Sequence, residues 1–227
     1  QPAANAGPCN NPQFSVPATP NSNTVNIAVA KNAKLVVGAE LNSFFAHKMK
    51  VAGGDPKQVV VNRFGSLQKV GGVSITTVPA AHTNGLPPEF LDKALGDALR
   101  ANGLTAYVGP ANGYVVIFSN GLSVYLSGDT GVTAEQDLVV RRYYKAKLAV
   151  INIGGVFTTG PAEAAYVITD LVKPNSVIAS HANEVATKDG KLLPNTRTAT
   201  FIKTVKIPAH APLSAKRMQF DTNGMSV

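Results

Sequence analysis

The chain has 227 residues, of which 44% are hydrophobic and 15% are charged, and its formal net charge is +8. This length can bury a substantial core in one large domain or at most two small ones. No run approaches the roughly 18 to 20 apolar residues that cross a bilayer, so we expect a soluble protein with no membrane partner.

The positive charge raises the question of a nucleic-acid partner. The basic residues are dispersed, however, and Arg141–Lys147 is the one dense patch. Its two tyrosines can in principle stack on bases, but a solvated helix end whose tyrosines pack on a sheet is the simpler interpretation. We therefore expect no nucleic-acid partner. A positive field can also raise the encounter rate of an anionic small-molecule substrate.

Residues 1–23 are predicted to form a flexible leader. The first 20 residues contain five prolines and no charge, a composition that disfavours both helix and continuous strand. The single cysteine, Cys9, allows no internal disulfide. A chain that starts at Gln1 is consistent with signal cleavage, so we expect a bacterial periplasmic or secreted protein, with the cytoplasm as the alternative. Residues 24–227 are predicted to form a single domain.

The first part of this domain alternates short helices and strands. Helices are predicted over Val25–Lys31 and Glu40–Met49, the second with Phe44 and Phe45 facing inward. Strands are predicted over Lys34–Gly38, Val59–Asn62, Leu67–Val70 and Val73–Val78. An insertion helix at about 87–102 begins with prolines and carries an apolar stripe. It is predicted to be a lid or pocket wall, with an ordinary surface helix as the alternative.

The second part begins with a hairpin. Strands Tyr114–Phe118 and Leu122–Leu126 are separated by Ser-Asn-Gly, and Asn-Gly tolerates the positive backbone angles of a tight turn. Helices are then predicted over Glu135–Tyr144, 160–172 and Thr198–Val205, and strands over Leu148–Ile153, Val177–Ala179 and Arg217–Phe220. The predicted fold class is mixed α and β.

Three potential metal ligands stand where apolar strands end. His82 closes Val-Ser-Ile-Thr-Thr-Val-Pro-Ala-Ala-His, Asp129 closes Leu-Ser-Val-Tyr-Leu-Ser-Gly-Asp, and His181 closes Val-Ile-Ala-Ser-His. A rigid sheet can aim such loop residues at one point. Two imidazoles and a carboxylate suit zinc or another borderline divalent ion better than calcium or magnesium. The alternatives are a hydrogen-bonded loop histidine at 82 and a turn-capping aspartate at 129.

The order of these segments carries a family resemblance. Gly113–Gly131, then Leu148–Pro161 with Ile-Gly-Gly-Val-Phe-Thr-Thr-Gly-Pro, then Ser180–His181, together resemble the metallo-β-lactamase superfamily, and within it the ascorbate-6-phosphate-lactonase-like hydrolases. The resemblance implies an α/β (α+β) fold of the αββα sandwich type. The superfamily's His-x-His-x-Asp-His motif matches no stretch of this sequence. The fold is therefore expected to lack its first strands and its first metal-ligand loop.

The resemblance also implies roles for the strand-end residues. His82 would be the last histidine of the first metal site, Asp129 the carboxylate that two metals share, and His181 the final ligand of the second. Zinc, manganese or iron is expected, with one ion or none in place of the usual two. Asp129 would take part in catalysis, with Glu184 as the reserve general base or as a residue that orients His181. His47 and His210 are interpreted as bystanders.

Two functions follow from the resemblance. One is a hydrolase in which a metal-activated water attacks a lactone, an ester or a phosphoester. The other is a metal-free, degenerate member that binds a small ligand or a protein through the old cleft. The missing strands would leave a sheet edge unpaired, so a homo-oligomer is a further expectation.

Overall fold

The computed structural model describes residues 24–91, 93–213 and 216–227. The predicted leader with Cys9 therefore lies outside the described residues. The chain divides into two compact units: unit 1 comprises the residues up to Arg63 together with Thr83–Pro110, and unit 2 comprises Phe64–His82 with Ala111–Val227. The single domain over 24–227 stays a prediction. None of the described helices is long and apolar enough to cross a membrane.

Unit 1 contains short elements joined by turns. Its described helices are α1 (Thr24–Ala30), α2 (Asn42–Val51) and α3 (Lys93–Ala101), with the 3-10 turns η3 (Ala39–Leu41), η4 (Pro56–Gln58) and η5 (Pro88–Phe90). Its described strands are β1 (Leu35–Val37) and β2 (Val59–Val61), which pair in parallel, and β5 (Gly85–Leu86) and β6 (Ala106–Tyr107), which pair antiparallel. The predicted insertion helix forms as η5 followed by α3, and its role as a lid stays a prediction.

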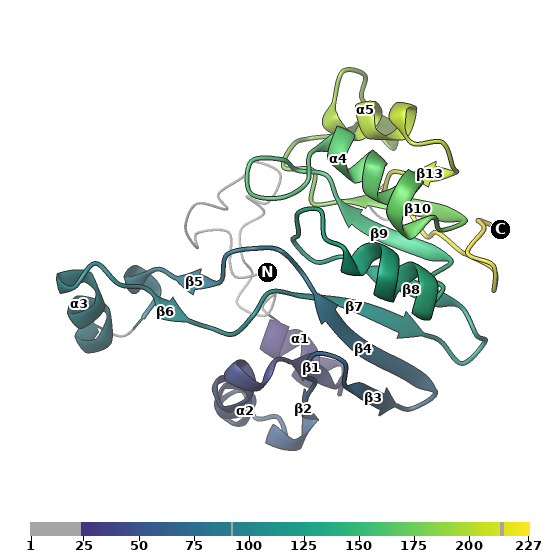
Figure 1. Cartoon of the computed structure of the whole chain (residues 1–227). Helices are drawn as coiled ribbons and strands as arrows, with labels where there is room; N and C mark the ends of the chain where they lie inside the picture. The colour runs from purple at the N-terminus through teal and green to yellow at the C-terminus, as the bar shows by residue number, and fades with distance from the viewer. Residues whose placement is uncertain (1–23, 92, 214–215) are drawn as a thin grey trace. The chain divides into compact units, whose positions relative to one another are not determined.

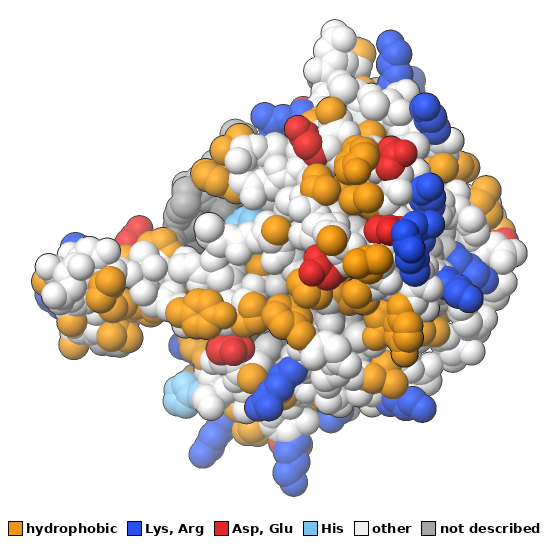
Figure 2. Space-filling view, in the orientation of Figure 1, with side chains coloured by type: hydrophobic (Ala, Val, Ile, Leu, Met, Phe, Trp, Pro, Cys, Tyr) orange, Lys and Arg blue, Asp and Glu red, His pale blue; other side chains and the backbone are white. Residues whose placement is uncertain are grey.

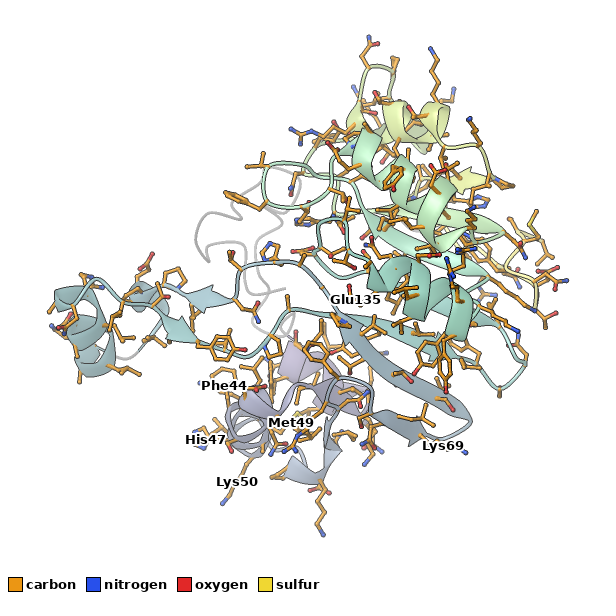
Figure 3. The ribbon with its side chains drawn as sticks, in the orientation of Figure 1. Phe44, His47, Met49, Lys50, Lys69 and Glu135 are labelled. Atoms are coloured by element: carbon orange, nitrogen blue, oxygen red, sulfur yellow. The ribbon has the colours of Figure 1, made fainter. Side chains whose placement is uncertain are left out.

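Helix α2 differs from its prediction in the face that it buries. Met49 is fully buried, whereas Phe44 is 53% exposed (Figure 3) and meets Phe45 edge to face with ring centroids 5.2 Å apart. Phe45 and Met49 are four residues apart and share a helix face, while Phe44 is rotated away from it. The prediction that Phe44 faces inward is therefore wrong. His47 is exposed on α2, as expected for a bystander.

Unit 2 is built on one seven-stranded mixed sheet (Figure 1), with strand order β13-β10-β9-β8-β7-β4-β3. Strands β8, β9, β10 and β13 run parallel, and the other neighbours pair antiparallel. The strands are β3 (Leu67–Val70), β4 (Val73–Pro79), β7 (Asn112–Ile117), β8 (Ser123–Leu126), β9 (Leu148–Asn152), β10 (Ser176–Ser180) and β13 (Ala209–His210). A separate hairpin joins β11 (Thr187–Lys188) to β12 (Lys191–Leu192).

Helices cover one face of this sheet. They are the π-helical η6 (Gln136–Tyr143), α4 (Pro161–Tyr166) continued by the π-helical η7 (Val167–Val172), and α5 (Arg197–Thr204). In β9, Ala149 and Ile151 belong to the core under these helices, while Leu148 and Val150 belong to a smaller cluster with Phe220. This alternation follows from the two-residue period of a strand. The predicted mixed α/β fold with a large sheet is confirmed.

The C-terminal segment differs from its prediction. Arg217–Phe220 forms no strand, and its one β-bridge joins Phe220 to Ser226. Strand β13 was not predicted, because two residues between prolines carry no period-2 signal. The turn at 221–225 is held where β9 and β10 begin, through its carbonyl oxygens: Lys147 donates to Thr222, Asn175 to Asn223 and Ser176 to Gly224.

Candidate functional site

The candidate site lies at one edge of the sheet in unit 2. Strands β8, β9 and β10 are parallel, and β4 runs in the same direction because it and β8 are both antiparallel to β7. The carboxyl ends of all four strands therefore meet at one edge, where ligands of open sheets usually bind. The loops that carry His82, Asp129 and His181 therefore leave the sheet at this edge, and a metal-binding role for these residues stays a prediction.

A tight turn positions Asp129 after β8. Gly128 has a φ of +61°, and a Cβ at this position would lie 2.3 Å from the carbonyl oxygen of Asn112. Only glycine fits this close approach to the neighbouring strand. The chain can therefore leave β8 and place Asp129 at the edge at once.

A second close approach positions His181 after β10. His181 itself has a left-handed φ of +46°. At Gly154, after β9, a Cβ would lie 2.4 Å from the His181 carbonyl oxygen and 2.5 Å from the Asn183 side-chain nitrogen. The loop that carries His181 thus packs directly on the backbone that follows β9.

These two turns bring Asp129 and His181 together. The His181 Nε2 atom lies 3.7 Å from Oδ2 of Asp129, and the two side chains are 18% and 46% exposed. An imidazole and a carboxylate at this separation can form an ion pair when the histidine is protonated. They can equally donate to a shared divalent ion when it is neutral.

His82 reaches the same edge on a loop that is bonded to the Asp129 turn. The Ala81 amide donates to Thr130 Oγ1 at 2.9 Å, and the Gly131 amide donates to the Ala81 carbonyl oxygen at 3.0 Å. Among residues 24–91, 93–213 and 216–227, however, no three His, Cys, Asp or Glu side chains are grouped closely enough to hold a metal. Sequence reasoning placed three ligands together, and the structure pairs Asp129 with His181.

A buried polar network supports the Asp129 turn. The Asn152 side chain, 1% exposed, donates to the Thr130 carbonyl oxygen at 2.9 Å and to Thr159 Oγ1 at 2.8 Å, and it accepts from Ser127 Oγ at 3.1 Å. The Thr159 amide adds a bond to the Thr130 carbonyl oxygen at 3.0 Å. Sequence reasoning missed Asn152. The available signal was an amide side chain at the end of an otherwise apolar strand.

Gln136 holds the other side of the same turn. Its side chain donates to the Gly131 carbonyl oxygen at 3.2 Å and accepts from the Thr133 amide at 3.0 Å. Beneath it, Tyr125 is fully buried, and this burial raises the pKa of Tyr125 to about 12, an effect that nearby Gln136 partly offsets. The Tyr125 hydroxyl makes no hydrogen bond of good geometry.

Glu184 has a structural partner. Its Oε1 atom accepts from the Thr198 amide at 2.9 Å and from Thr198 Oγ1 at 3.3 Å. A carboxylate that binds an amide in the first turn of α5 stabilises the start of that helix. The contact gives Glu184 a capping role, and a role as general base stays a prediction.

The donor set fits part of a metal shell. Imidazole nitrogen and carboxylate oxygen suit zinc, manganese or iron, and Asp129 and His181 lie close enough to share an ion. Two side chains leave a tetrahedral ion incomplete, so an ion here needs further ligands besides this pair.

Comparison with known proteins finds relatives that are named metal-dependent hydrolases. The chain is 32% identical over 120 residues to a UPF0173 metal-dependent hydrolase of Polaromonas sp., covering 53% of this chain and 41% of that protein. It is 30% identical over 157 residues to a UPF0173 metal-dependent hydrolase of Roseiflexus castenholzii, covering 69% and 57%. The chain thus spans about half the length of the curated relatives it matches. No family model matches it.

Solved structures agree on the fold. Igni18, a metallo hydrolase from Ignicoccus hospitalis, matches 89% of this chain and 71% of its own with a TM-score of 0.58 at 20% identity. The predicted metallo-β-lactamase superfamily resemblance is confirmed. A possible metal-dependent hydrolase from Veillonella parvula also matches, with a TM-score of 0.50 at 14% identity over 91% of this chain. The structure brings together Asp129 and His181, two of the residues for which the resemblance implies a metal-binding role. That role stays a prediction.

Proposed function

We infer that this chain carries the strand-end part of a metal-dependent hydrolase site. The observation that carries the proposal is the 3.7 Å approach of His181 to Asp129 at the edge where β4, β8, β9 and β10 end. The relatives named as metal-dependent hydrolases support the same reaction class. A bound divalent ion would supply Lewis acidity and lower the pKa of its water toward neutrality.

Neighbouring residues hold and orient Asp129 and His181, the proposed metal ligands. Gly128 lets the chain turn so that Asp129 stands at the edge, and Gly154 lets the His181 loop pack beside it. The Asn152 network fixes the backbone next to Asp129. Because the Asp129 side chain is 46% exposed, a small substrate can reach it from solvent. A lactone, ester or phosphoester is the proposed substrate range, and zinc the proposed ion.

The test is metal stoichiometry in protein purified without chelators, measured by plasma mass spectrometry. We expect on the order of one ion per chain, and a marked loss in both Asp129→Asn and His181→Ala. His47→Ala is the control because His47 is exposed on α2 of unit 1. Absence of metal after incubation with excess zinc, in protein that unfolds cooperatively, would refute the hydrolase proposal.

A metal-free binding protein is the second candidate. It is favoured by one observation, that the described part of the chain groups no three metal-ligating side chains. It predicts that Asp129→Asn and His181→Ala leave metal content unchanged at background level. It also predicts that the thermal midpoint of unfolding does not rise when zinc is added.

A further inference from the structure

The loops at the site edge of unit 2 carry an unusual charge pattern. The segments 79–82, 127–140, 153–172 and 181–187 contain no Lys or Arg, although the whole chain carries a net charge of +8. Four acids lie in the loops after β8 and β10 and at the starts of η6 and α4: Asp129, Glu135, Glu163 and Glu184. The site edge is therefore locally acidic in a basic protein.

Four basic side chains of unit 2 lie at the opposite end of the parallel strands, whereas Lys188, Lys191 and Arg197 follow the His181 loop in the sequence. Arg141 and Arg142 end helix η6, and Lys147 and Lys173 precede β9 and β10, at the opposite end of the parallel strands. Figure 2 shows Lys and Arg side chains clustered at the end of the sheet near the C-terminus of Figure 1. These side chains give that end of the sheet a positive charge, which can attract an anion.

Arg197 contacts the loop that follows His181. Its Nη1 atom donates to the carbonyl oxygens of Ala182 and Asn183, each at 3.3 Å. These bonds tie the loop that follows His181. Nη1 of the guanidinium is thus directed at backbone acceptors.

Exposed apolar side chains stand beside the ligands on the same loops. Val132 follows the Asp129 turn and Val185 follows the His181 loop, and both are exposed. The loop between β9 and α4 (Figure 1) carries Val156, 83% exposed, and Phe157, 78% exposed. Large exposed apolar side chains gathered at a site indicate binding of an apolar group.

The β9–α4 loop is fixed at both ends to the ligand loops. Gly154 packs on His181 and Asn183, while the Thr159 amide bonds the carbonyl next to Asp129. Val156 between them has a φ of +62°, a conformation that costs a β-branched residue on the order of 1 to 3 kcal/mol. The loop is thus fixed at both ends and strained at Val156, and it exposes Val156 and Phe157 to solvent. These properties are typical of a loop that contacts a ligand.

We propose that Phe157, with Val156, binds the apolar group of an uncharged substrate beside Asp129 and His181. This inference rests on the proposed hydrolase function and narrows its substrate class. Neutral esters or lactones with an alkyl or aryl group fit the acidic, apolar edge. Phosphoesters fit this edge less well, because each would add negative charge where the acids of the loops already offset part of the charge of the proposed ion.

The first test is binding of N-phenyl-1-naphthylamine, an uncharged fluorophore that brightens in apolar surroundings. We expect saturable binding that Phe157→Ala weakens by about tenfold, the effect of losing one buried aromatic contact. Tyr143→Ala is the matched control, because Tyr143 is an aromatic residue of the same unit with 75% exposure, on η6. This readout needs neither metal nor turnover.

The second test is hydrolysis by zinc-loaded protein. We expect kcat/KM for p-nitrophenyl esters to rise from acetate to octanoate, and to exceed that for p-nitrophenyl phosphate. Phe157→Ala should remove the dependence on acyl length, and Tyr143→Ala should keep it. Both variants should unfold at the wild-type temperature, because both side chains are exposed.

The two tests separate the inference from the function on which it rests. If no ester or phosphoester is cleaved but the fluorophore binds in a Phe157-dependent way, the hydrolase proposal fails and the apolar binding site stands. If the phosphoester is the better substrate and Phe157→Ala changes nothing, the inference is overturned and the hydrolase stands. A dimer seen by sedimentation that Phe157→Ala dissociates would assign the loop to a second copy and also overturn the inference.

Discussion

Asn152 offers the most direct test of how the Asp129 turn is held. Its side chain makes three hydrogen bonds, to Thr130, Thr159 and Ser127, at 1% exposure. At a net value of about 0.5 to 1.5 kcal/mol each, Asn152→Ala should lower the free energy of unfolding by about 2 to 4 kcal/mol. The loss should not exceed this range, because two of the former partners keep another hydrogen bond. Ser127 still donates to the Gly128 carbonyl oxygen, and the Thr130 carbonyl oxygen still accepts from the Thr159 amide.

The assay is urea unfolding followed by circular dichroism, with metal content measured on the same samples. Ser176→Ala is the control, because Ser176 is fully buried at the other end of the sheet and donates to the Gly224 carbonyl oxygen alone. It should cost about 1 kcal/mol and leave metal content unchanged, whereas Asn152→Ala should reduce it. Equal costs for the two variants would refute the assignment of Asn152 as the hub of the network.

Asn152→Asp refines this test through pH. The carboxylate would lose both donated bonds and face the Thr130 carbonyl oxygen, so burial should raise its pKa above the unfolded value. A raised pKa in the folded state means that the protonated form is favoured there. The stability of this variant should therefore increase as pH falls, relative to Asn152→Ala. A pH-independent difference would indicate that water enters the network.

Three further predictions concern the same unit. Gly154→Ala should destabilise by about 2 kcal/mol or more, since its Cβ meets the His181 backbone at 2.4 Å. Gly131→Ala should cost less than about 0.5 kcal/mol, because its nearest contact is 3.8 Å; similar unfolding midpoints for the two would contradict the close-approach argument. Burial raises the pKa of Tyr125 to about 12, so this residue stays protonated in the folded protein while it ionises near pH 10 in the unfolded chain. Stability should therefore fall as pH rises from about 10 to 12, and Tyr125→Phe should remove that alkaline loss in unfolding monitored against pH. Glu184→Ala should cost about 1 kcal/mol by uncapping α5 and leave metal content unchanged; loss of metal would instead place Glu184 in the site.

The fold followed closely from sequence patterns where the local signal was strong. The hairpin of β7 and β8 was predicted from Ser-Asn-Gly, and β9 and β10 from short apolar runs, because their strands are buried on both faces. The face of α2 was predicted incorrectly at Phe44, since adjacent aromatics cannot both lie on one narrow helix face. Strand β13 escaped prediction because only its parallel pairing with β10 defines it.

Part of the site could be predicted because strands β8 and β10 have strong sequence signals. Asp129 and His181 could be placed at one edge because each follows a strand, and their pairing depends on two glycines whose close approaches only coordinates reveal. The Asn152 network could not be predicted, since its partners lie up to 25 residues away in sequence. The net charge of +8 describes the whole chain. It therefore gave no sign that the loops at this edge of the sheet are acidic.

The turn at 221–225 has a consequence for how the chain matures during synthesis. It bonds the residues at which β9 and β10 begin, through Lys147, Asn175 and Ser176. A ribosome adds amino acids at about 5 to 20 per second and releases this turn after every strand of the sheet. The amino ends of β9 and β10 therefore gain these bonds only after the turn at 221–225 has been made, while their carboxyl ends, next to Asp129 and His181, can already be assembled.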